Sequence, residues 1–323
     1  MKAVVLRATP EGGVFEVAEV PKPEVEAGKV LVKVRAAGVN RGELITQKNY
    51  RAGPEVINGI EFTGEVAAIG EGVRGWARGA PVMGHGRQSM AEYVQVDPRA
   101  LMATPDSLDV LHAAAFPNVF ITSHNAIVTA GGLKRGETVI VNAASSGIGT
   151  ASVQVARAMG AGKIVAVSRL RSKAERVRPL GATDVVGSDE EQLETAVLAA
   201  TGGLGGDLLI DSLGGAYLPA NLRSLALEGR LVSVGRTAGP TSELDLDHLS
   251  LRRLRIIGVT FRTRTPEEAL RCVEACARDL LPALASGEIK PVVDSDFPMA
   301  RIADAHRRLA SNEQFGKIVV TLD

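Results

Sequence analysis

Apolar and polar residues alternate over short stretches in the first hundred residues of the chain. The segments KAVVLRA, KVLVKVRAAGV, GEVAAIG and AEYVQV keep this two-residue period, and Gly or Pro punctuates the stretches between them. A two-residue period is typical of β-strands, because successive side chains point to opposite faces of a sheet. The pattern therefore predicts a β-rich, barrel-like lobe at the start of the chain.

The pattern changes at about residue 109. Apolar runs typical of buried strands, among them ETVIVNAA, KIVAVSR and DLLIDSLG, now alternate with segments of helical periodicity such as GTASVQVARAMGA. Alternation of this kind predicts a parallel sheet with helices on both faces. The expected fold class is α/β, with a doubly wound sheet of Rossmann type joined to the β-rich barrel lobe.

Length and charge agree with this division. A chain of 323 residues is long enough for two domains. Lysine and arginine number 37, against 37 aspartates and glutamates, and 45% of residues are hydrophobic. The chain therefore has the apolar residues for a core and no charge bias toward nucleic acid or an anionic membrane.

The N-terminus MKAVVLRATPEGG has an apolar run too short for a signal peptide, and no apolar stretch is long enough to span a membrane. We expect a cytoplasmic protein. The two cysteines, Cys272 and Cys276, lie four residues apart in a helical pattern without the further Cys or His that a metal site needs, which indicates a structural role. The five histidines show no ligand-like spacing either.

The stretch VIVNAASSGIG, residues 139–149, places Ser145, Ser146, Gly147, Ile148 and Gly149 between a strand and a helix. A dinucleotide pyrophosphate binds at such a turn, since small residues let the backbone approach it and the helix N-terminus offers N–H groups. Ala144 and Ser146 replace the first two glycines of the usual motif, so a plain tight turn is the alternative. The βα units that follow favour the nucleotide site.

A serine and glycine turn of this kind also opens short-chain dehydrogenases, which carry a Tyr-x-x-x-Lys pair. Here more than 130 residues precede the turn, and no lysine follows Tyr50, Tyr93 or Tyr217 at the required spacing. Both observations exclude that family.

Several phrases in order carry a different resemblance: AAGVN, GIEFTGEVAAIGEGV, GGLKRGETVIVNAASSGIG, DLLIDSLGG and a terminal FGKIVVTL. Over essentially its whole length the chain resembles the medium-chain dehydrogenase/reductase superfamily. The segments AAGVNRGEL and GVTFRTR are most similar to its zinc-independent, zeta-crystallin-like quinone oxidoreductase branch. The resemblance implies a GroES-like catalytic domain over 1–121, a Rossmann NADP-binding domain over 122–264, and a return to the catalytic domain over 265–323.

A zinc alcohol dehydrogenase has Cys where this chain has Asn40, and Gly-His-Glu where it reads Gly59-Ile60-Glu61. Neither Asn40 nor Ile60 supplies a usual zinc ligand, so we predict no metal site. Without a Lewis acid to ionise an alcohol, the favoured chemistry is reduction of an electrophilic C=C bond or a quinone.

The resemblance also assigns site residues. It puts Asn40 beside the nicotinamide, where its amide could donate a hydrogen bond, and makes Tyr50 a candidate to orient substrate or relay a proton. The alternatives are a turn-capping Asn and a surface Tyr, and Ile45 stands where other members carry a tyrosine. Thr122 and Lys317 are expected at the cofactor, against a helix-start hydroxyl and a solvated lysine. The expected cofactor contacts are completed by Ser212, Gly235, Arg236 and Phe261.

The end of KIVAVSRLRSK predicts the cofactor. NAD-binding relatives carry an acidic residue there to bind the ribose hydroxyls, whereas this chain has Ser168. Arg169 and Lys173 follow and could pair with a 2′-phosphate, although Ser188 replaces a tyrosine that relatives often have near the adenine ribose. NADPH is therefore the predicted cofactor.

The sequence thus predicts an NADPH-dependent, zinc-independent reductase of quinones or α,β-unsaturated carbonyl compounds. An enoyl-thioester reductase of the same superfamily and a non-catalytic NADPH-binding protein are the alternatives. The expected partner is a small electrophilic substrate, with no nucleic acid or membrane. The apolar segment LRIIGVTF, residues 254–261, reads as an edge strand that would pair with a second copy in a homodimer.

Overall fold

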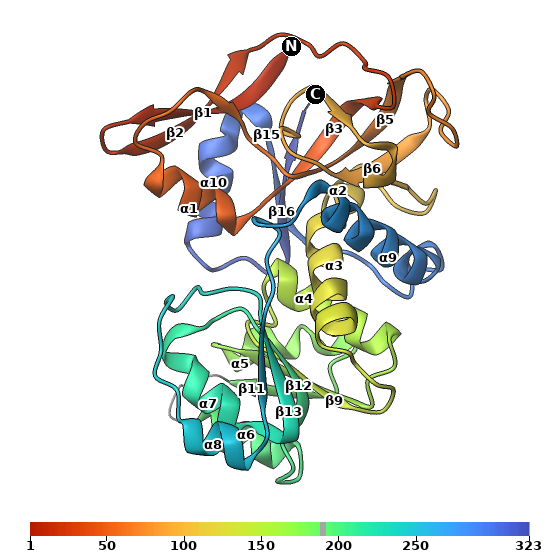
Figure 1. Cartoon of the computed structure of the whole chain (residues 1–323). Helices are drawn as coiled ribbons and strands as arrows, with labels where there is room; N and C mark the ends of the chain where they lie inside the picture. The colour runs from red at the N-terminus through yellow and green to blue at the C-terminus, as the bar shows by residue number, and fades with distance from the viewer. Residues whose placement is uncertain (188–191, 323) are drawn as a thin grey trace. The chain divides into compact units, whose positions relative to one another are not determined.

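The computed structural model describes residues 1–187 and 192–322. The chain forms two compact units (Figure 1): unit 1 comprises Met1–Asn118 with Val273–Asp323, and unit 2 comprises Val119–Cys272. The expected boundaries after residues 121 and 264 compare with 118 and 272 here. None of the helices formed by the described residues is long and apolar enough to cross a membrane.

Unit 1 is built mainly on antiparallel strands, and β15 pairs in parallel with β16. Its larger sheet has the order β15-β16-β3-β5-β6-β8, with β7 also paired to β3, and a smaller sheet has the order β2-β1-β4. The strands are β1 (Lys2–Thr9), β2 (Gly12–Glu19), β3 (Val30–Val39), β4 (Val56–Ile57), β5 (Glu61–Ile69), β6 (Pro81–His85), β7 (Tyr93–Val96), β8 (Leu101–Ala103), β15 (Val293–Pro298) and β16 (Lys317–Thr321).

Strand β3 lies at the centre of this unit, between β16 and β5. Both neighbours run antiparallel to β3, so the end of β3 at Val39 lies beside the starts of β5 at Glu61 and of β16 at Lys317. Three distant segments of the chain therefore meet at one edge of the sheet. The helices of the unit are α1 (Arg41–Asn49), α2 (Val110–Ala114) and α10 (Ile302–Ala310).

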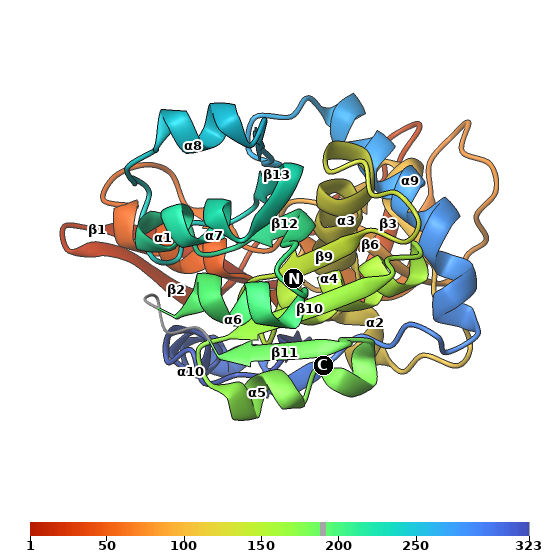
Figure 2. The ribbon, with the colours of Figure 1, turned by 90° about the horizontal axis from the view of Figure 1, so that it is seen from below.

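Unit 2 contains a six-stranded parallel sheet with the order β11-β10-β9-β12-β13-β14. Figure 2 shows β11, β10, β9, β12 and β13 side by side in this order. The strands are β9 (Thr138–Val141), β10 (Lys163–Ser168), β11 (Asp184–Gly187), β12 (Gly206–Asp211), β13 (Leu225–Ser233) and β14 (Arg255–Gly258). This is a Rossmann-like sheet, as the βα alternation predicts.

The helices of unit 2 are α4 (Gly147–Ala158), α5 (Arg171–Glu175), α6 (Leu193–Ala200), α7 (Leu218–Arg223) and α8 (Leu246–Leu251). The chain passes between the units within α3 (Pro117–His124) and α9 (Pro266–Ala285). Apolar side chains of β9, β10, β12 and β13 are buried with those of α6 and α7 in one core. That core fixes β9 beside β12, where the strand order reverses and open α/β sheets bind ligands.

Candidate active site

The turn after β9 has the geometry that a dinucleotide requires. Ser146 is the N-cap residue of α4, and its Oγ accepts a hydrogen bond of 3.0 Å from the backbone N–H of Gly149. A Cβ atom at Gly149 would lie 2.2 Å from the carbonyl oxygen of Ala143, so only glycine lets the helix approach the turn this closely. The first N–H groups of α4 have no acceptor within the helix and carry the positive end of its dipole. Ser145 to Gly149 therefore fit a pyrophosphate.

The neighbouring strand ends carry the other expected cofactor contacts. Ser168 ends β10 and is buried, and its Oγ lies 3.2 Å from Ser145 Oγ. Arg169 is exposed, and Lys173 lies in α5 and is half-buried. Among the described residues, the end of β10 carries Ser168 and Arg169 in place of a carboxylate that would repel a phosphate. Ser188, expected near the adenine ribose, lies outside the described residues.

The ends of β12 and β13 add an unsatisfied polar atom. Ser212 Oγ is buried and has no hydrogen-bond partner in the described part of the chain. A Cβ atom at Gly235 would lie 2.8 Å from the carbonyl oxygen of Ser212, so these two strand ends approach closely. Arg236 next to it is exposed. A buried hydroxyl without a partner is an expected feature of a site that a ligand completes. The Ser212 hydroxyl and the turn after β9 together are compatible with a bound nicotinamide dinucleotide at this edge of unit 2.

Thr122 and Phe261 complete the expected set in unit 2. Thr122 is a mid-helix residue of α3 and not a helix-start hydroxyl, since the helix begins at Pro117. Phe261 follows β14, and its ring packs under the guanidinium of Arg264 at 5.1 Å. The assignment of both side chains to the cofactor stays a prediction.

Sequence reasoning missed a buried polar group beside the turn. Asp211, the last residue of β12, accepts hydrogen bonds from the N–H groups of Leu213 and Gly214. Burial raises the pKa of Asp211, although these N–H groups and the amides of Asn142 and Asn221 oppose that shift. An aspartate that ends an apolar strand, as in DLLID, is the signal that could have identified it.

In unit 1 the structure brings Asn40 together with groups from β3, β5, β16 and the start of α3. The Asn40 amide oxygen accepts hydrogen bonds from Lys317 Nζ at 2.9 Å and from Asn118 Nδ2 at 2.7 Å. Its amide nitrogen donates to Glu61 Oε1 at 2.9 Å and to the Gly38 carbonyl at 3.2 Å. We call Asn40, Glu61, Asn118 and Lys317 the Asn40 cluster.

The backbone of Asn40 is held as firmly as its side chain. Its N–H donates to Glu43 Oε1 at 2.7 Å, while Glu43 Oε2 accepts from Asn58 Nδ2 at 2.9 Å and lies 2.8 Å from His306 Nε2. Glu43 and His306 are both buried. Asn40 is the N-cap residue of α1, but its amide makes the four bonds described above, so it is more than a turn-capping residue.

The cluster changes two expectations. Both amide hydrogens of Asn40 are engaged, so it could donate to a ligand only by giving up a bond, and the one to Gly38 is the longest of the four. Lys317 is neither solvated nor directed at a ligand, because its ammonium group donates to Val39 O, Asn40 Oδ1 and Glu61 Oε1. Lys317 could therefore contact the cofactor only by giving up one of these bonds.

Tyr50 is not brought to the Asn40 cluster. It lies at the opposite end of α1 from Asn40, and a nine-residue helix is roughly 14 Å long. The Tyr50 hydroxyl donates to the carbonyl oxygen of Pro54 in the same loop. This environment is that of a loop tyrosine, which was the alternative to a catalytic role.

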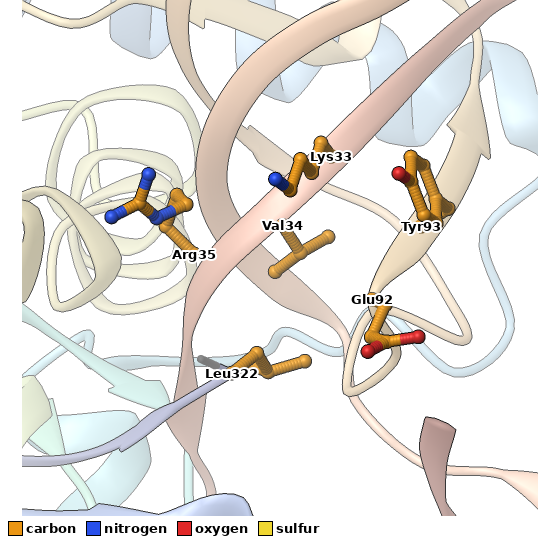
Figure 3. Close-up of a pocket in the computed structure, with 6 residues that line it drawn as sticks. All are labelled: Lys33, Val34, Arg35, Glu92, Tyr93 and Leu322. Atoms are coloured by element: carbon orange, nitrogen blue, oxygen red, sulfur yellow. The ribbon is translucent and has the colours of Figure 1, made fainter. Parts of the chain in front are cut away.

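Two further features bear on ligands. Among residues 1–187 and 192–322, no three His, Cys, Asp or Glu side chains gather in a way that could hold a metal ion. An open pocket of about 470 Å³ in unit 1 is lined by Lys33, Val34, Arg35, Glu92, Tyr93 and Leu322 (Figure 3). It holds none of the candidate site residues, and its β3 residues lie five or more positions before Asn40, so we do not assign it to the reaction.

Comparison with known proteins identifies the class. Residues 26–106 match the alcohol dehydrogenase GroES-like domain, and residues 147–275 match the zinc-binding dehydrogenase family. The crystal structure of a Thermus thermophilus quinone oxidoreductase, also solved as a complex with NADPH, is 32% identical, covers 100% of both chains and superposes with a TM-score of 0.84. The chain belongs to the medium-chain dehydrogenase/reductase superfamily, in its quinone oxidoreductase branch, and is an oxidoreductase.

Two curated relatives extend the comparison. Human quinone oxidoreductase is 29% identical over 91% of this chain and 89% of its own length. Acryloyl-coenzyme A reductase of Metallosphaera sedula is 28% identical over 99% of this chain and 100% of its own. The chain also matches polyketide synthases but spans only a small part of them, for instance 14% of a spectinabilin synthase protein of Streptomyces orinoci, which is 31% identical.

Proposed function

We propose that the protein reduces quinones or α,β-unsaturated carbonyl compounds by direct hydride transfer from NADPH, without zinc. The observation that carries the proposal is the position of Asn40 and the hydrogen bonding of its amide. This residue stands where zinc alcohol dehydrogenases have a cysteine, and its amide is bonded to Glu61, Gly38, Lys317 and Asn118. A position occupied in this way favours a substrate that is already electrophilic and needs no Lewis acid.

Each unit has its part in this proposal. NADPH supplies the hydride when it is bound. The turn Ser145 to Gly149 binds the pyrophosphate, and Ser168 with Arg169 receives the ribose that carries the 2′-phosphate. Asn40 presents a fixed polar edge to the reacting end of the cofactor, as the family resemblance implies.

The proposal is tested by following NADPH oxidation with a simple quinone and with a simple enone. We expect turnover with at least one of them, and an unchanged rate after prolonged chelation. Zinc at one equivalent per chain, lost together with activity on chelation, would refute the zinc-independent mechanism. Binding of NADPH without turnover on any acceptor would favour a non-catalytic role.

An enoyl-thioester reductase is the second candidate. The match to acryloyl-coenzyme A reductase, which extends over essentially the full length of both chains, favours it specifically. A thioester-activated C=C bond is an electrophile of the same kind, so the Asn40 cluster is compatible with either substrate. Comparing kcat/KM for an enoyl-coenzyme A with that for a quinone decides between them.

We also propose a homodimer that extends the sheet of unit 2. Strand β14 is at the end of the strand order, paired with β13, and Ile256 on it is 41% exposed. An edge strand with exposed apolar side chains can pair with a copy of itself. Sedimentation at micromolar concentration is expected to show a dimer that Ile256→Lys weakens, and a monomer for the unmodified chain would contradict this.

A further inference from the structure

The ammonium group of Lys317 is an internal cation. An ammonium group has three N–H donors, and here they reach three oxygen atoms: Val39 O at 2.8 Å, Asn40 Oδ1 at 2.9 Å and Glu61 Oε1 at 2.7 Å. Lys317 is 4% exposed. All three N–H donors of Lys317 are therefore used in hydrogen bonds to Val39, Asn40 and the buried carboxylate of Glu61.

The carboxylate of Glu61 is fully buried and equally engaged. Its Oε1 accepts from Lys317 and from the Asn40 amide, and its Oε2 accepts from the backbone N–H of Asn118 at 2.7 Å, in the first turn of α3. A Cβ atom at Gly38 would lie 2.2 Å from Glu61 Oε1, so the carboxylate can occupy this position only because residue 38 is glycine.

Together these charges fix the orientation of the Asn40 amide. The amide oxygen faces the ammonium of Lys317, and the amide nitrogen faces the carboxylate of Glu61. A rotation of the amide by 180° would turn the NH₂ group toward the cation and the oxygen toward the anion, which electrostatics disfavours on both sides. Without the ion pair, Asn118 and Gly38 alone would hold the amide.

Fold stability alone does not account for a buried ion pair at these positions. A buried ion pair contributes little more to stability than an apolar pair of similar volume. The particular effect of the Lys317–Glu61 pair is on Asn40.

We propose that Lys317 and Glu61 are positioning residues that hold the Asn40 amide in one orientation for the reaction. The inference rests on the proposed function, since it assigns these two residues a role in the same reductive step. In this proposal they act through Asn40, which both of them contact, and not by direct contact with substrate or cofactor.

The first experiment removes the side chain of Lys317 and supplies an alkylammonium ion from solution in its place. We expect Lys317→Ala to lower kcat roughly 100-fold, because misplacement of a site group by about 1 Å can cost this much, and to leave the Kd for NADPH within about threefold, since the turn of unit 2 is unchanged. Ethylammonium or propylammonium should restore at least about tenfold of the lost kcat and raise the Tm of the variant. Tetramethylammonium, which has the charge but no N–H donor, should restore neither.

The matched control is Lys33→Ala, which removes an exposed lysine from β3 in the same unit. Its kcat, Tm and response to alkylammonium ions should equal those of the unmodified chain. An amine effect common to Lys33→Ala and Lys317→Ala would overturn the inference, as would full activity of Lys317→Ala without amine.

A second variant keeps the test decisive if Lys317→Ala does not fold. Glu61→Gln with Lys317→Met removes both charges and leaves no uncompensated ion, so a Tm close to that of the unmodified chain is expected. Reduced kcat with intact NADPH binding in this variant supports the inference, and unchanged kcat overturns it. An unmodified chain inactive with every acceptor would refute the proposed function and this inference together, whereas an active chain with an indifferent double variant refutes the inference alone.

Discussion

Each unit contains an ion pair with a buried cation, Lys317 in unit 1 and Arg230 in unit 2, but the two pairs lie differently with respect to the candidate site residues of their own unit. In unit 1 the Lys317–Glu61 pair contacts Asn40 directly. In unit 2 the guanidinium of Arg230 donates to Glu137 at 2.6 Å and to backbone carbonyls that include that of Gly131. Glu137 precedes β9, whereas the turn that fits the cofactor follows the other end of this strand.

This difference separates two uses of buried charge. In the proposed function, the turn of unit 2 binds the cofactor through backbone N–H groups and small residues, which need no side-chain charge nearby, and the Arg230 pair joins backbone groups at the opposite edge of the sheet. The proposed role of unit 1 depends on a side-chain amide that could rotate, and two charged groups contact that amide. Breaking the pair in unit 2 should cost stability alone, and breaking the cluster of unit 1 should cost turnover.

The largest expected effect is on stability. Glu137→Gln removes the carboxylate partner of Arg230, which is 5% exposed, and because Glu137 itself is partly exposed we expect a loss of about 3 kcal/mol of unfolding free energy, the lower end of the cost for a fully buried pair. Denaturant unfolding measures this loss, and kcat is expected to stay unchanged. A lowered kcat in a variant that is folded at the assay temperature would break the comparison.

The same pair gives a pH dependence. Burial alone raises the pKa of Glu137, but hydrogen bonds from Arg230 and the Lys134 N–H outweigh burial and hold the pKa below its ordinary value. The stability that this carboxylate contributes is therefore complete above the ordinary carboxyl pKa of the unfolded chain, and is lost as pH falls through the lowered pKa of the folded chain. The Tm difference between the unmodified chain and Glu137→Gln should narrow over this acid range.

The next largest effect is on turnover. Asn40→Ala removes the amide that the cluster holds, and we expect kcat to fall roughly 100-fold, about 2.7 kcal/mol of activation free energy. The Kd for NADPH should remain nearly unchanged. The matched control is Asn49→Ala, at the exposed far end of α1. Equal kcat for Asn40→Ala and the unmodified chain would give Asn40 a structural role only.

The choice of cofactor follows. A charge-assisted hydrogen bond contributes on the order of 1.5 to 3 kcal/mol, so we expect kcat/KM to favour NADPH over NADH by roughly ten- to a hundredfold. Ser168→Asp with Arg169→Ala should shrink or reverse the preference, because a carboxylate there binds ribose hydroxyls and repels the 2′-phosphate. Equal kcat/KM for the two cofactors in the unmodified chain would refute the assignment of Arg169.

The smallest effect concerns the turn itself. A Cβ atom at residue 149 would meet Ala143 O at 2.2 Å and Ala144 Cα at 2.5 Å, so Gly149→Ala must push α4 away from the turn. We expect the Kd for NADPH to rise about tenfold, near 1.4 kcal/mol, with a smaller change in kcat at saturation. Gly258→Ala is the control, since a Cβ there meets nothing within 4 Å. Unchanged NADPH binding in Gly149→Ala would remove the turn from the site.

Most elements of unit 2 could be predicted from the sequence. The strands ETVIVNAA, KIVAVSR and DLLIDSLG are strands here, and the turn between β9 and α4 begins its helix at Gly147. The differences have local causes. The segment SKAERVRPLG, residues 172–181, has a helical pattern, but the helix ends at Glu175 and a 3₁₀ turn follows, since Pro179 cannot continue an α-helix. The helical pattern of PANLRSLAL, residues 219–227, also extends too far: the helix ends at Arg223, and Leu225 begins β13 and pairs with Gly206.

The candidate site was predictable where it is local and unpredictable where it is not. Ser145 to Gly149 form one turn, so their order along the chain specifies their geometry. Glu61 and Lys317 lie 256 positions apart and meet only because β5 and β16 both pair with β3. The sequence indicates that Glu61 could be a buried charge, because it stands between the apolar residues Ile60 and Phe62. It does not indicate that Lys317 is the partner of this charge.

The sequence by itself pointed to the family through the resemblance of several phrases in order. It also determined the two lobes and the turn after β9, because strand periodicity, helix caps and close glycine contacts act between residues near one another in the chain. Only the tertiary structure decided what Asn40 does with its amide and that Lys317 faces inward. Those outcomes depend on which strands lie side by side. A buried polar side chain must form its hydrogen bonds with neighbouring protein groups, because water cannot reach it.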